Sequence, residues 1–340
     1  MKVEGAPLVS LTLFTFNQQD LVREAIDGAL SQTYQPLEII ISDDCSSDNT
    51  YEVILSAVAA YRGPHTIRVN RNRVNLGLGA HVSKVHAMVQ GVVVVHAAGD
   101  DVSLPNRVGR IMEEYLRQPL RSLLIESNAL VINDVGVVTG NYHAVRAPGI
   151  YESIHPWKKM TAGGGATYAL SRDFIDLFDP IPSDFIAEDG LLNVRSNLLS
   201  GVLYIPEPLL KYRVSDRGMW NSMMKLGLGH DVVVRNEAKW TDHRIKICHQ
   251  AILDTAKLRE LGRLSCGRAA RCLVELDRVQ IELGEWQALL KDGFLRSLRA
   301  LAWGVSRGDY IEKARWAKMF LLRWFGGQIN AARKVLEYGR

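Results

Sequence analysis

The sequence predicts an α/β protein with a mostly parallel central sheet, flanked by helices and followed by a helical C-terminal region. Over residues 8–212, short runs rich in β-branched residues alternate with amphipathic segments of helical length, a pattern typical of βαβ units. Beyond this stretch strand signals become sparse, and residues 231–338 contain several helical segments separated by glycines. We therefore expect a boundary near Ser215, with one domain over residues 1–215 and a second over residues 216–340.

The composition excludes several classes of protein. With 340 residues, 47% of them hydrophobic and 23% charged, the chain has the composition of an ordinary globular protein. Its longest apolar run, around residues 92–95, is far shorter than the roughly 20 residues that span a bilayer, and the N-terminus lacks a signal-peptide pattern. We expect a cytoplasmic protein without a transmembrane helix. The four cysteines form no Cys-x-x-Cys pair, so we expect reduced thiols and no structural zinc.

The first domain contains five clear strand candidates, each a short run of β-branched or large apolar residues. They are residues 8–14, 37–42, 66–70, 92–97 and 123–132. An amphipathic helix with a 3.6-residue period is expected between the first two strands, and another after the second strand, where Asp48 is a candidate helix cap.

Polar residues follow the first two predicted strands. Thr15, Phe16 and Asn17 come after the first strand, and Asp43 and Asp44 come after the second. Ligands of open α/β sheets bind beyond the carboxyl ends of the strands, so both clusters are candidates for one crevice. Turn and cap chemistry is the alternative, but adjacent carboxylates repel each other unless a ligand or a hydrogen-bond donor compensates. We therefore single out Asp43 as a functional candidate.

Two further segments supply candidates. Asn75 and Gly77 lie in a polar turn before a predicted helix, a setting that suits a phosphate or a sugar hydroxyl. The turn lacks a glycine of the dinucleotide fingerprint, which disfavours a Rossmann dehydrogenase. Asp100 and Asp101 follow a buried strand and Gly99, and they are either ligands for a divalent cation shared with substrate phosphates or a solvated turn.

A third acidic pair, Glu188 and Asp189, stands just ahead of an apolar helix. One interpretation is that the helix dipole favours acids at this end. The other is that one of the two carboxylates faces the crevice as a general base.

In their order along the chain, these segments resemble family 2 inverting glycosyltransferases, which have the nucleotide-sugar-binding GT-A fold. The resemblance covers about residues 8–215. The matching segments are residues 9–17, 25–34, 38–50, 75–77, 99–101, 188–189 and 204–213.

The resemblance implies a GT-A catalytic domain that moves a sugar from a nucleoside diphosphate to an acceptor hydroxyl, with inversion at the anomeric carbon. It implies that Asp100, with Asp101, holds Mg²⁺ or Mn²⁺, and that Asp189 takes the acceptor proton. Glu188 would support that base or bind the acceptor, and Asp43 would contact the nucleobase. The implied nucleotide-binding residues are Thr15, Phe16, Asn17, Asp43, Asp44, Asn75, Gly77 and Asp100.

The resemblance also implies the partners: a UDP-, dTDP- or GDP-sugar as donor, and a glycan or lipid-linked glycan as acceptor. The family's habit is synthesis of a surface polysaccharide, such as O-antigen, capsule or cell-wall glycan.

Three positions depart from the family pattern. Ala98 stands at the first acidic place of the aspartate-x-aspartate motif, and Ser215 stands where many relatives have a histidine. Metal binding is then weaker, or is completed by substrate and water. Residues 82–83 are Val-Ser where many relatives have Arg-Asn. Candidates to replace that phosphate or sugar contact are Arg71, Lys84 and Arg107.

The C-terminal region is basic and rich in aromatic residues. Residues 291–340 carry 11 basic and 4 acidic residues, a net charge of +7, and this uneven distribution is not that of a uniformly basic nucleic-acid binder. The aromatic residues either pack on protein or form an amphipathic helix pair on the inner face of the cytoplasmic membrane. A homo-oligomer also stays open. Trp157 and Trp220 are candidates for stacking on a sugar ring or for filling the rim of the site.

Two alternative functions remain beside the glycosyltransferase. A sugar nucleotidyltransferase shares the architecture and the cation, but the first strand is not followed by a glycine-rich, basic triphosphate loop. A non-catalytic module that retains the fold would explain Ala98 and Ser215, whereas the intact Asp43, Asp100 and Asp189 count against it.

Overall fold

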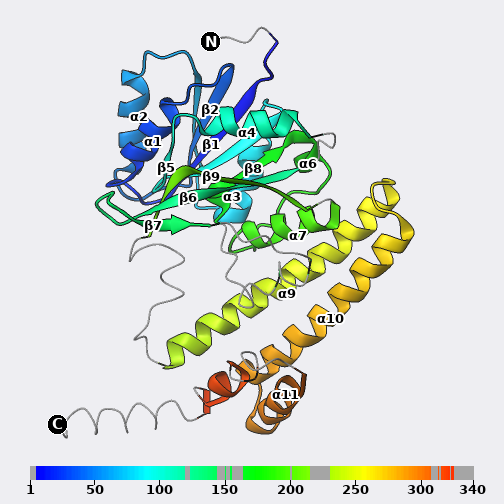
Figure 1. Cartoon of the computed structure of the whole chain (residues 1–340). Coiled ribbons are helices and arrows are strands. Elements are labelled where there is room, and N and C mark those ends of the chain that lie inside the picture. The colour runs from blue at the N-terminus through cyan, green and yellow to red at the C-terminus, as the bar shows by residue number, and fades with distance from the viewer. Residues whose placement is uncertain are drawn as a thin grey trace, which may run out of the picture. The chain divides into compact units, whose positions relative to one another are not determined.

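A computed structural model describes the chain at residues 5–118, 123–143, 150, 154, 164–199, 201–214, 230–307, 313, 315–321, 323 and 324. It divides into two compact units. The first comprises Met1–Ser215 with Asp254–Ala269, and the second comprises Asp216–Leu253 with Ala270–Arg340. The first unit holds the sheet and the second is helical in its described part (Figure 1).

The first unit is built on one sheet, which has nine strands among the described residues. Its strand order is β3 (Thr66–Arg71), β2 (Leu37–Asp43), β1 (Val9–Thr15), β4 (Val93–Ala98), β8 (Tyr168–Ser171), β6 (Leu124–Ile132), β9 (Val202–Arg213) and β5 (Val102–Ser103), with β7 (Val138–Tyr142) paired to β6.

The α/β class is confirmed, and the sheet is mixed. Strands β3, β2, β1 and β4 are parallel, so their carboxyl ends meet at one edge. Strand β8 then runs antiparallel to both β4 and β6, while β9 is parallel to β6. All five strands expected from the sequence are present, and no boundary differs by more than one residue. The direction of the later strands could not be predicted, because composition marks a strand without giving its partner.

The main core lies between one face of the sheet and the helices α1 (Val22–Leu30), α2 (Thr50–Ala60) and α4 (Arg107–Leu116). Alternate residues of a strand face the same side, so β1 supplies Val9, Leu11 and Leu13 to this core. All seven residues of β1 and of β2 are buried, and burial on both faces explains why these strands are continuous apolar runs.

The opposite face of the sheet is more polar. Phe14 of β1 packs edge-on against His81 of α3 (Leu78–His86) and against His96 of β4. The Nε2 atoms of His86 and His96 lie 2.8 Å apart, and burial lowers the pKa of His86 to about 3. Both imidazoles are therefore neutral, one donating to the other. Helices α6 (Arg172–Asp176) and α7 (Asp189–Leu199) complete the described helices of the unit before α9 (His230–Glu260).

In the second unit, the earlier part of α9 pairs with α10 (Cys266–Lys291), and α11 (Phe294–Arg307) follows. Glu237 is a polar centre of this unit. Its Oε1 accepts hydrogen bonds from Arg315 at 2.8 Å and from Trp286 Nε1 at 3.2 Å, with Arg244 at 3.3 Å. Trp286, Trp316, Met319 and Phe320 are buried in one cluster, so these C-terminal aromatic residues pack on protein.

Among the helices that the structure describes, none is both long enough and apolar enough to cross a membrane.

Candidate active site

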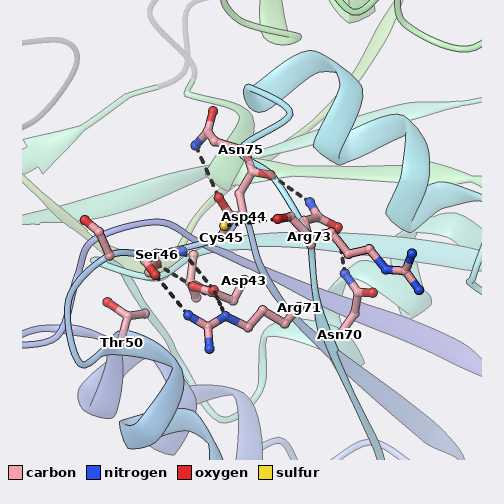
Figure 2. Close-up of polar contacts among 12 residues, drawn as sticks. Asp43, Asp44, Cys45, Ser46, Thr50, Asn70, Arg71, Arg73 and Asn75 are labelled. Carbon is pink, nitrogen blue, oxygen red and sulfur yellow. Dashed lines mark hydrogen bonds and ion pairs between the residues drawn. The ribbon is translucent and has the colours of Figure 1, made fainter.

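The carboxylate of Asp43 lies at the end of β2 and is fully buried. It accepts hydrogen bonds from the backbone N–H of Ser46 at 3.0 Å and from the Ser46 hydroxyl at 2.5 Å. Arg71 at the end of β3 lies 3.6 Å from Asp43 Oδ2 and donates to the Ser46 carbonyl oxygen at 3.1 Å (Figure 2). Protein donors therefore already compensate the charge of Asp43, and its proposed contact with a nucleobase stays a prediction.

Asp44 joins the end of β2 to the loop between β3 and α3 by hydrogen bonds. Its Oδ1 accepts from the Asn72 amide at 2.7 Å and from the Leu76 N–H at 2.9 Å, and its Oδ2 accepts from the Gly77 N–H at 3.0 Å. The Asn75 side chain donates to the backbone oxygen of Asp44 at 3.2 Å. Asp44, Asn75 and Gly77 are therefore brought together, as expected for one crevice. The hydrogen bonds described here join these residues to one another.

The loop after β1 is bonded to the loop after β2. Asn17 has a positive φ of 51°, which turns the chain so that its N–H donates to Ser46 Oγ and its Oδ1 accepts from the Ser47 N–H, both at 2.9 Å. Thr15 Oγ1 lies 3.2 Å from the Ser42 carbonyl oxygen. The Phe16 side chain is 46% exposed, so its ring presents an apolar surface to solvent beside these two loops.

Asp100 and Asp101 follow β4. Asp101 is buried, and its Oδ1 accepts from the backbone N–H of Arg213 at 2.7 Å. Burial raises the pKa of both carboxyl groups, and the charge of Asp100 raises that of Asp101 further. The turn that presents them is closely packed: a Cβ on Gly99 would lie 2.3 Å from Gln18 Oε1, so a larger residue there would displace the Gln18 side chain.

Arg213 links several segments around Asp100 by hydrogen bonds. No role was assigned to this residue from the sequence. Its buried side chain donates to the Asp100 carbonyl oxygen at 2.9 Å and to Glu24 of α1 at 2.7 Å. It also donates to the carbonyl oxygens of Asn133 and Asp134, each at 2.8 Å. Its place at the end of β9 could have drawn attention, since a charged residue closes an otherwise half-buried strand.

The donor set of Asp100 and Asp101 fits a hard divalent cation. Two adjacent carboxylates with pKa values raised by burial gain from a positive charge at this point. Within the described residues, no three His, Cys, Asp or Glu side chains come together as a metal site. The set suits an ion such as Mg²⁺, which binds through one or two carboxylates and takes its other ligands from phosphates and water.

The second acidic pair lies at the N-terminus of α7. Glu188 is buried and its Oε2 has no hydrogen-bond partner, and burial followed by the charge of Asp189 raises its pKa to about 8. Asp189 is half-buried, and its Oδ1 accepts from the Gly190 N–H at 2.7 Å. Burial also raises the pKa of Asp189.

Aromatic and acidic residues that the sequence did not single out surround this pair. Glu126 of β6 is buried, and Tyr142 of β7 donates to it at 3.2 Å. Burial raises the pKa of Glu126 to about 7. Tyr142 and Tyr212 have ring centroids 6.2 Å apart. Glu126 has a weak sequence signal, since it is a lone acid inside the apolar strand segment at residues 123–132.

Tyr212 connects the two acidic pairs. Burial raises the pKa of its hydroxyl, and so do the charges of Asp101, Asp100 and Asp189. Tyr212 lies close to both pairs: the N–H of the next residue, Arg213, donates to Asp101, and Cβ atoms on Gly164 and Gly165 would lie 3.3 Å from the Tyr212 ring and 1.8 Å from Glu188 Oε1.

The basic candidates for a phosphate contact have partners within the protein. Arg71 pairs with Asp43 and lies 4.5 Å from the centroid of the Tyr51 ring. Lys84 donates to Asn72 Oδ1 at 2.6 Å. Arg107 is fully buried, and it donates to Ser103 Oγ at 3.0 Å and to the Ala166 carbonyl oxygen at 2.6 Å. Of the other candidates, Trp157, Ser215 and Trp220 lie outside the described residues.

Comparison with known proteins identifies the family of the first part of the chain. The sequence matches the family model "Glycosyl transferase family 2" over residues 10–124, which include β1 to β4 and the Asp43 and Asp100 regions. The chain therefore carries a family 2 glycosyltransferase domain. Similar sequences include "Putative colanic acid biosynthesis glycosyl transferase WcaA" of Escherichia coli, 33% identical over 106 residues that make up 31% of this chain and 37% of that protein. "Uncharacterized protein Rv1520" of Mycobacterium tuberculosis is 26% identical over 289 residues, 78% of each chain.

Solved structures share the fold of this glycosyltransferase. The complex of Staphylococcus aureus TarS 1-349 with UDP aligns with a TM-score of 0.51 at 13% identity, covering 93% of this chain and 90% of that one. The mannosyltransferase PcManGT from Pyrobaculum calidifontis, in complex with GDP-Man and Mn²⁺, aligns with a TM-score of 0.50 at 15% identity, covering 92% and 79% of the two chains. The expected GT-A fold is confirmed.

Proposed function

We propose that this glycosyltransferase moves a sugar from a nucleoside-diphosphate sugar to an acceptor hydroxyl by direct displacement, with inversion at the anomeric carbon. The observation that carries the proposal is that Tyr212 lies beside both acidic pairs, next to Arg213, which bonds Asp101, and against the Gly164–Gly165 backbone that Glu188 also contacts. One pair follows β4, where ligands of parallel sheets bind, and the other opens α7. A donor sugar between them would have its diphosphate near Asp100 and its anomeric carbon facing Asp189.

Asp189 is the proposed general base. Its ionised carboxylate accepts the proton of the acceptor hydroxyl while the hydroxyl oxygen bonds to the anomeric carbon, and the bond from that carbon to the diphosphate oxygen breaks with its electron pair on the diphosphate. Burial raises the pKa of Asp189, which makes it a stronger base than an exposed aspartate. A base and a leaving group on opposite sides of the carbon give inversion.

Glu188 is proposed to stay protonated during the reaction. Its pKa of about 8 leaves it mainly neutral at pH 7, and neutrality of one member of an adjacent pair favours ionisation of the other. Glu188 thereby keeps the single negative charge of this pair on Asp189. Its unpartnered Oε2 can also donate a hydrogen bond to an acceptor hydroxyl.

Asp100 and Asp101 are the proposed holders of Mg²⁺ or Mn²⁺. When bound, such a cation offsets the charge that develops on the departing diphosphate. The acidic surroundings support this assignment, because the carboxylates of Asp100, Asp101 and Asp189 would otherwise repel an anionic donor. The backbone N–H of Arg213 keeps Asp101 in place.

Nucleotide binding is proposed for the loops after β1 and β2. Phe16 offers the exposed ring on which a base or a ribose can pack, and Asn17, Asn75 and Gly77 line the same loops, which Asp43 and Asp44 hold together. Similar structures contain UDP or GDP-Man, which supports a nucleotide-sugar donor. Synthesis of a surface polysaccharide on a glycan or lipid-linked glycan acceptor is the proposed pathway, supported by similarity to the WcaA protein.

Calorimetric titration tests the proposal. The purified protein is titrated with UDP, dTDP and GDP, each with and without Mn²⁺, and the series is repeated with Asp100→Ala. We expect one diphosphate to bind with help from the cation and to lose that help in the variant. Failure of every diphosphate to bind favours a non-catalytic module, whereas tight binding of a nucleoside triphosphate with sugar 1-phosphate turnover favours a nucleotidyltransferase.

A further inference from the structure

Helix α11 has one narrow buried stripe. Ser297, Ala300 and Gly304 are buried, and they follow each other at spacings of three and four residues, so they lie on one side of the helix. The cluster beside them includes Trp316 and Phe320, which are 5% and 6% exposed. This side is packed within the second unit, and the buried aromatic residues belong to its core.

A second apolar stripe of α11 faces solvent. Leu295 is 73% exposed, Leu298 43% and Val305 37%, and Ala302 is also exposed. These four residues, the outer stripe, recur at spacings of three, four and three residues. That spacing places them on one side of the helix, away from the side of Ala300. Scattered exposed leucines are ordinary on a protein surface, but a continuous apolar row is a mark of an interaction site.

The charge beside the outer stripe is positive. Helix α11 contains three arginines and no acidic residue. Arg296 pairs with Glu285 at 3.3 Å, and Arg307 lies 4.9 Å from the centroid of the Trp303 ring. Arg299, next to Leu295 and Leu298 on the helix surface, is exposed, and no acidic side chain in the described part of the chain forms an ion pair with it. Residues 291–340 have a net charge of +7.

We propose that the outer stripe of α11 docks on an anionic lipid surface. The helix lies along the membrane, the side chains of Leu295, Leu298 and Val305 enter the boundary between headgroups and acyl chains, and Arg299 binds lipid phosphate. An apolar row with a basic residue at its border, here Arg299, is typical of interfacial helices, and an anionic surface attracts a basic segment.

Charge argues against a second copy of this chain as the occupant. Two outer stripes packed face to face would bring Arg299 of both copies into the same apolar contact, and that charge has no compensating acid on α11. A lipid surface supplies the opposite charge. The proposal does not depend on the activity proposed for the first unit.

Co-sedimentation of the full chain with vesicles tests the proposal. The vesicles contain phosphatidylcholine alone or phosphatidylcholine mixed with phosphatidylglycerol. We expect binding to the mixed vesicles only, weakening as salt screens the charges. Replacing Leu295 and Leu298 together by Gln removes apolar contacts without changing charge, and should lower the bound fraction roughly fivefold or more. Arg299→Gln should lower it while leaving the outer stripe intact.

The matched control is Val274→Gln. Val274 lies on α10 in the same unit and is 72% exposed, almost the same as Leu295, so this variant should sediment like the parent protein. Circular dichroism and light scattering are recorded for each variant. Equal binding of the Leu295 and Leu298 double variant and the parent would overturn the proposal, as would absence of binding to the mixed vesicles. A parent dimer that this double variant dissociates, with unchanged vesicle binding, would assign the outer stripe to self-association instead.

Discussion

The buried carboxyl group of Glu188 packs directly against Gly165, in the short 3₁₀ turn Gly165–Thr167 that precedes β8. A Cβ on Gly165 would lie 1.8 Å from Glu188 Oε1. The absence of a side chain at this glycine is what gives the carboxyl group its place at the start of α7. A residue remote in sequence therefore limits the space available to Glu188, the neighbour of the proposed base.

Gly165→Ala is expected to displace Glu188 and to reduce sugar transfer strongly, while nucleotide diphosphate binding at the loops after β1 and β2 is unchanged. The measurements are transfer rate and calorimetric affinity. Gly109→Ala is the matched control, because a Cβ there meets no atom within 4 Å. Wild-type transfer by Gly165→Ala would show that the Glu188 position does not matter for the reaction.

Glu126 gives a prediction for the pH dependence of stability. Burial raises its pKa to about 7 in the folded protein, whereas an unfolded chain has the ordinary value near 4.3. Between these two pH values the folded state binds more protons than the unfolded state. The stability that the protonated Glu126 contributes is therefore complete below about pH 4 and is lost as pH rises through about 7.

The isosteric variant Glu126→Gln cannot ionise, and it still offers an oxygen to the Tyr142 hydroxyl. Its free energy of unfolding should fall less than that of the parent between pH 4.5 and 7.5, the difference reaching up to roughly 3 kcal/mol. Urea unfolding at several pH values measures it. Identical pH profiles for the two proteins would mean that Glu126 is ionised in the fold at an ordinary pKa.

Sequence reasoning found the strands because β1, β2 and β4 are buried on both faces and are therefore apolar throughout. It also found the acidic pairs, since polar residues directly after such strands stand out. It could not foresee that Asp43 is already paired with Ser46, because that pairing requires the turn at Cys45, whose φ is 62°. Glu126 was missed because its partner Tyr142 comes from another strand, and residue spacing does not report register across a sheet.

The aromatic residues near the C-terminus show the same limit. The sequence left open whether they pack on protein or contact a membrane, and the burial of Trp316 and Phe320 now places these two in the core of the second unit. Helical spacing identifies apolar faces but does not say which of two faces of one helix is covered. Leu295 and Leu298 are exposed because the core of the second unit lies on the other side of α11.

The buried ion pair of Arg195 and Asp254 is expected to stabilise the first unit strongly against loss of either partner. Arg195 Nε lies 2.8 Å from Asp254 Oδ2, with side chains only 4% and 1% exposed. Arg195→Met should lower the free energy of unfolding by about 3–5 kcal/mol, because it removes the guanidinium that faces a buried carboxylate. The double variant Arg195→Met with Asp254→Leu should recover much of that loss.

Denaturant unfolding of the full chain measures these differences. Lys257 and Asp179, 2.8 Å apart within the same unit with side chains 33% and 67% exposed, provide the comparison. Lys257→Met should lower the free energy of unfolding by less than about 1 kcal/mol, since solvent screens this pair. A similar cost for Arg195→Met would mean that the Arg195 pair contributes no more than a surface contact.

Asp189→Asn tests the proposed base most directly. The amide cannot take the acceptor proton at neutral pH, so the transfer rate should fall roughly 10²- to 10⁴-fold, while the affinity for the nucleotide diphosphate, which is bound by other residues, stays unchanged. Asp173→Asn is the matched control, since Asp173 is also an acid in the first turn of a helix of the first unit but is exposed. If Asp189→Asn transfers sugar at the parental rate, the base lies elsewhere, and Glu126, with its pKa of about 7, becomes the next carboxylate to replace.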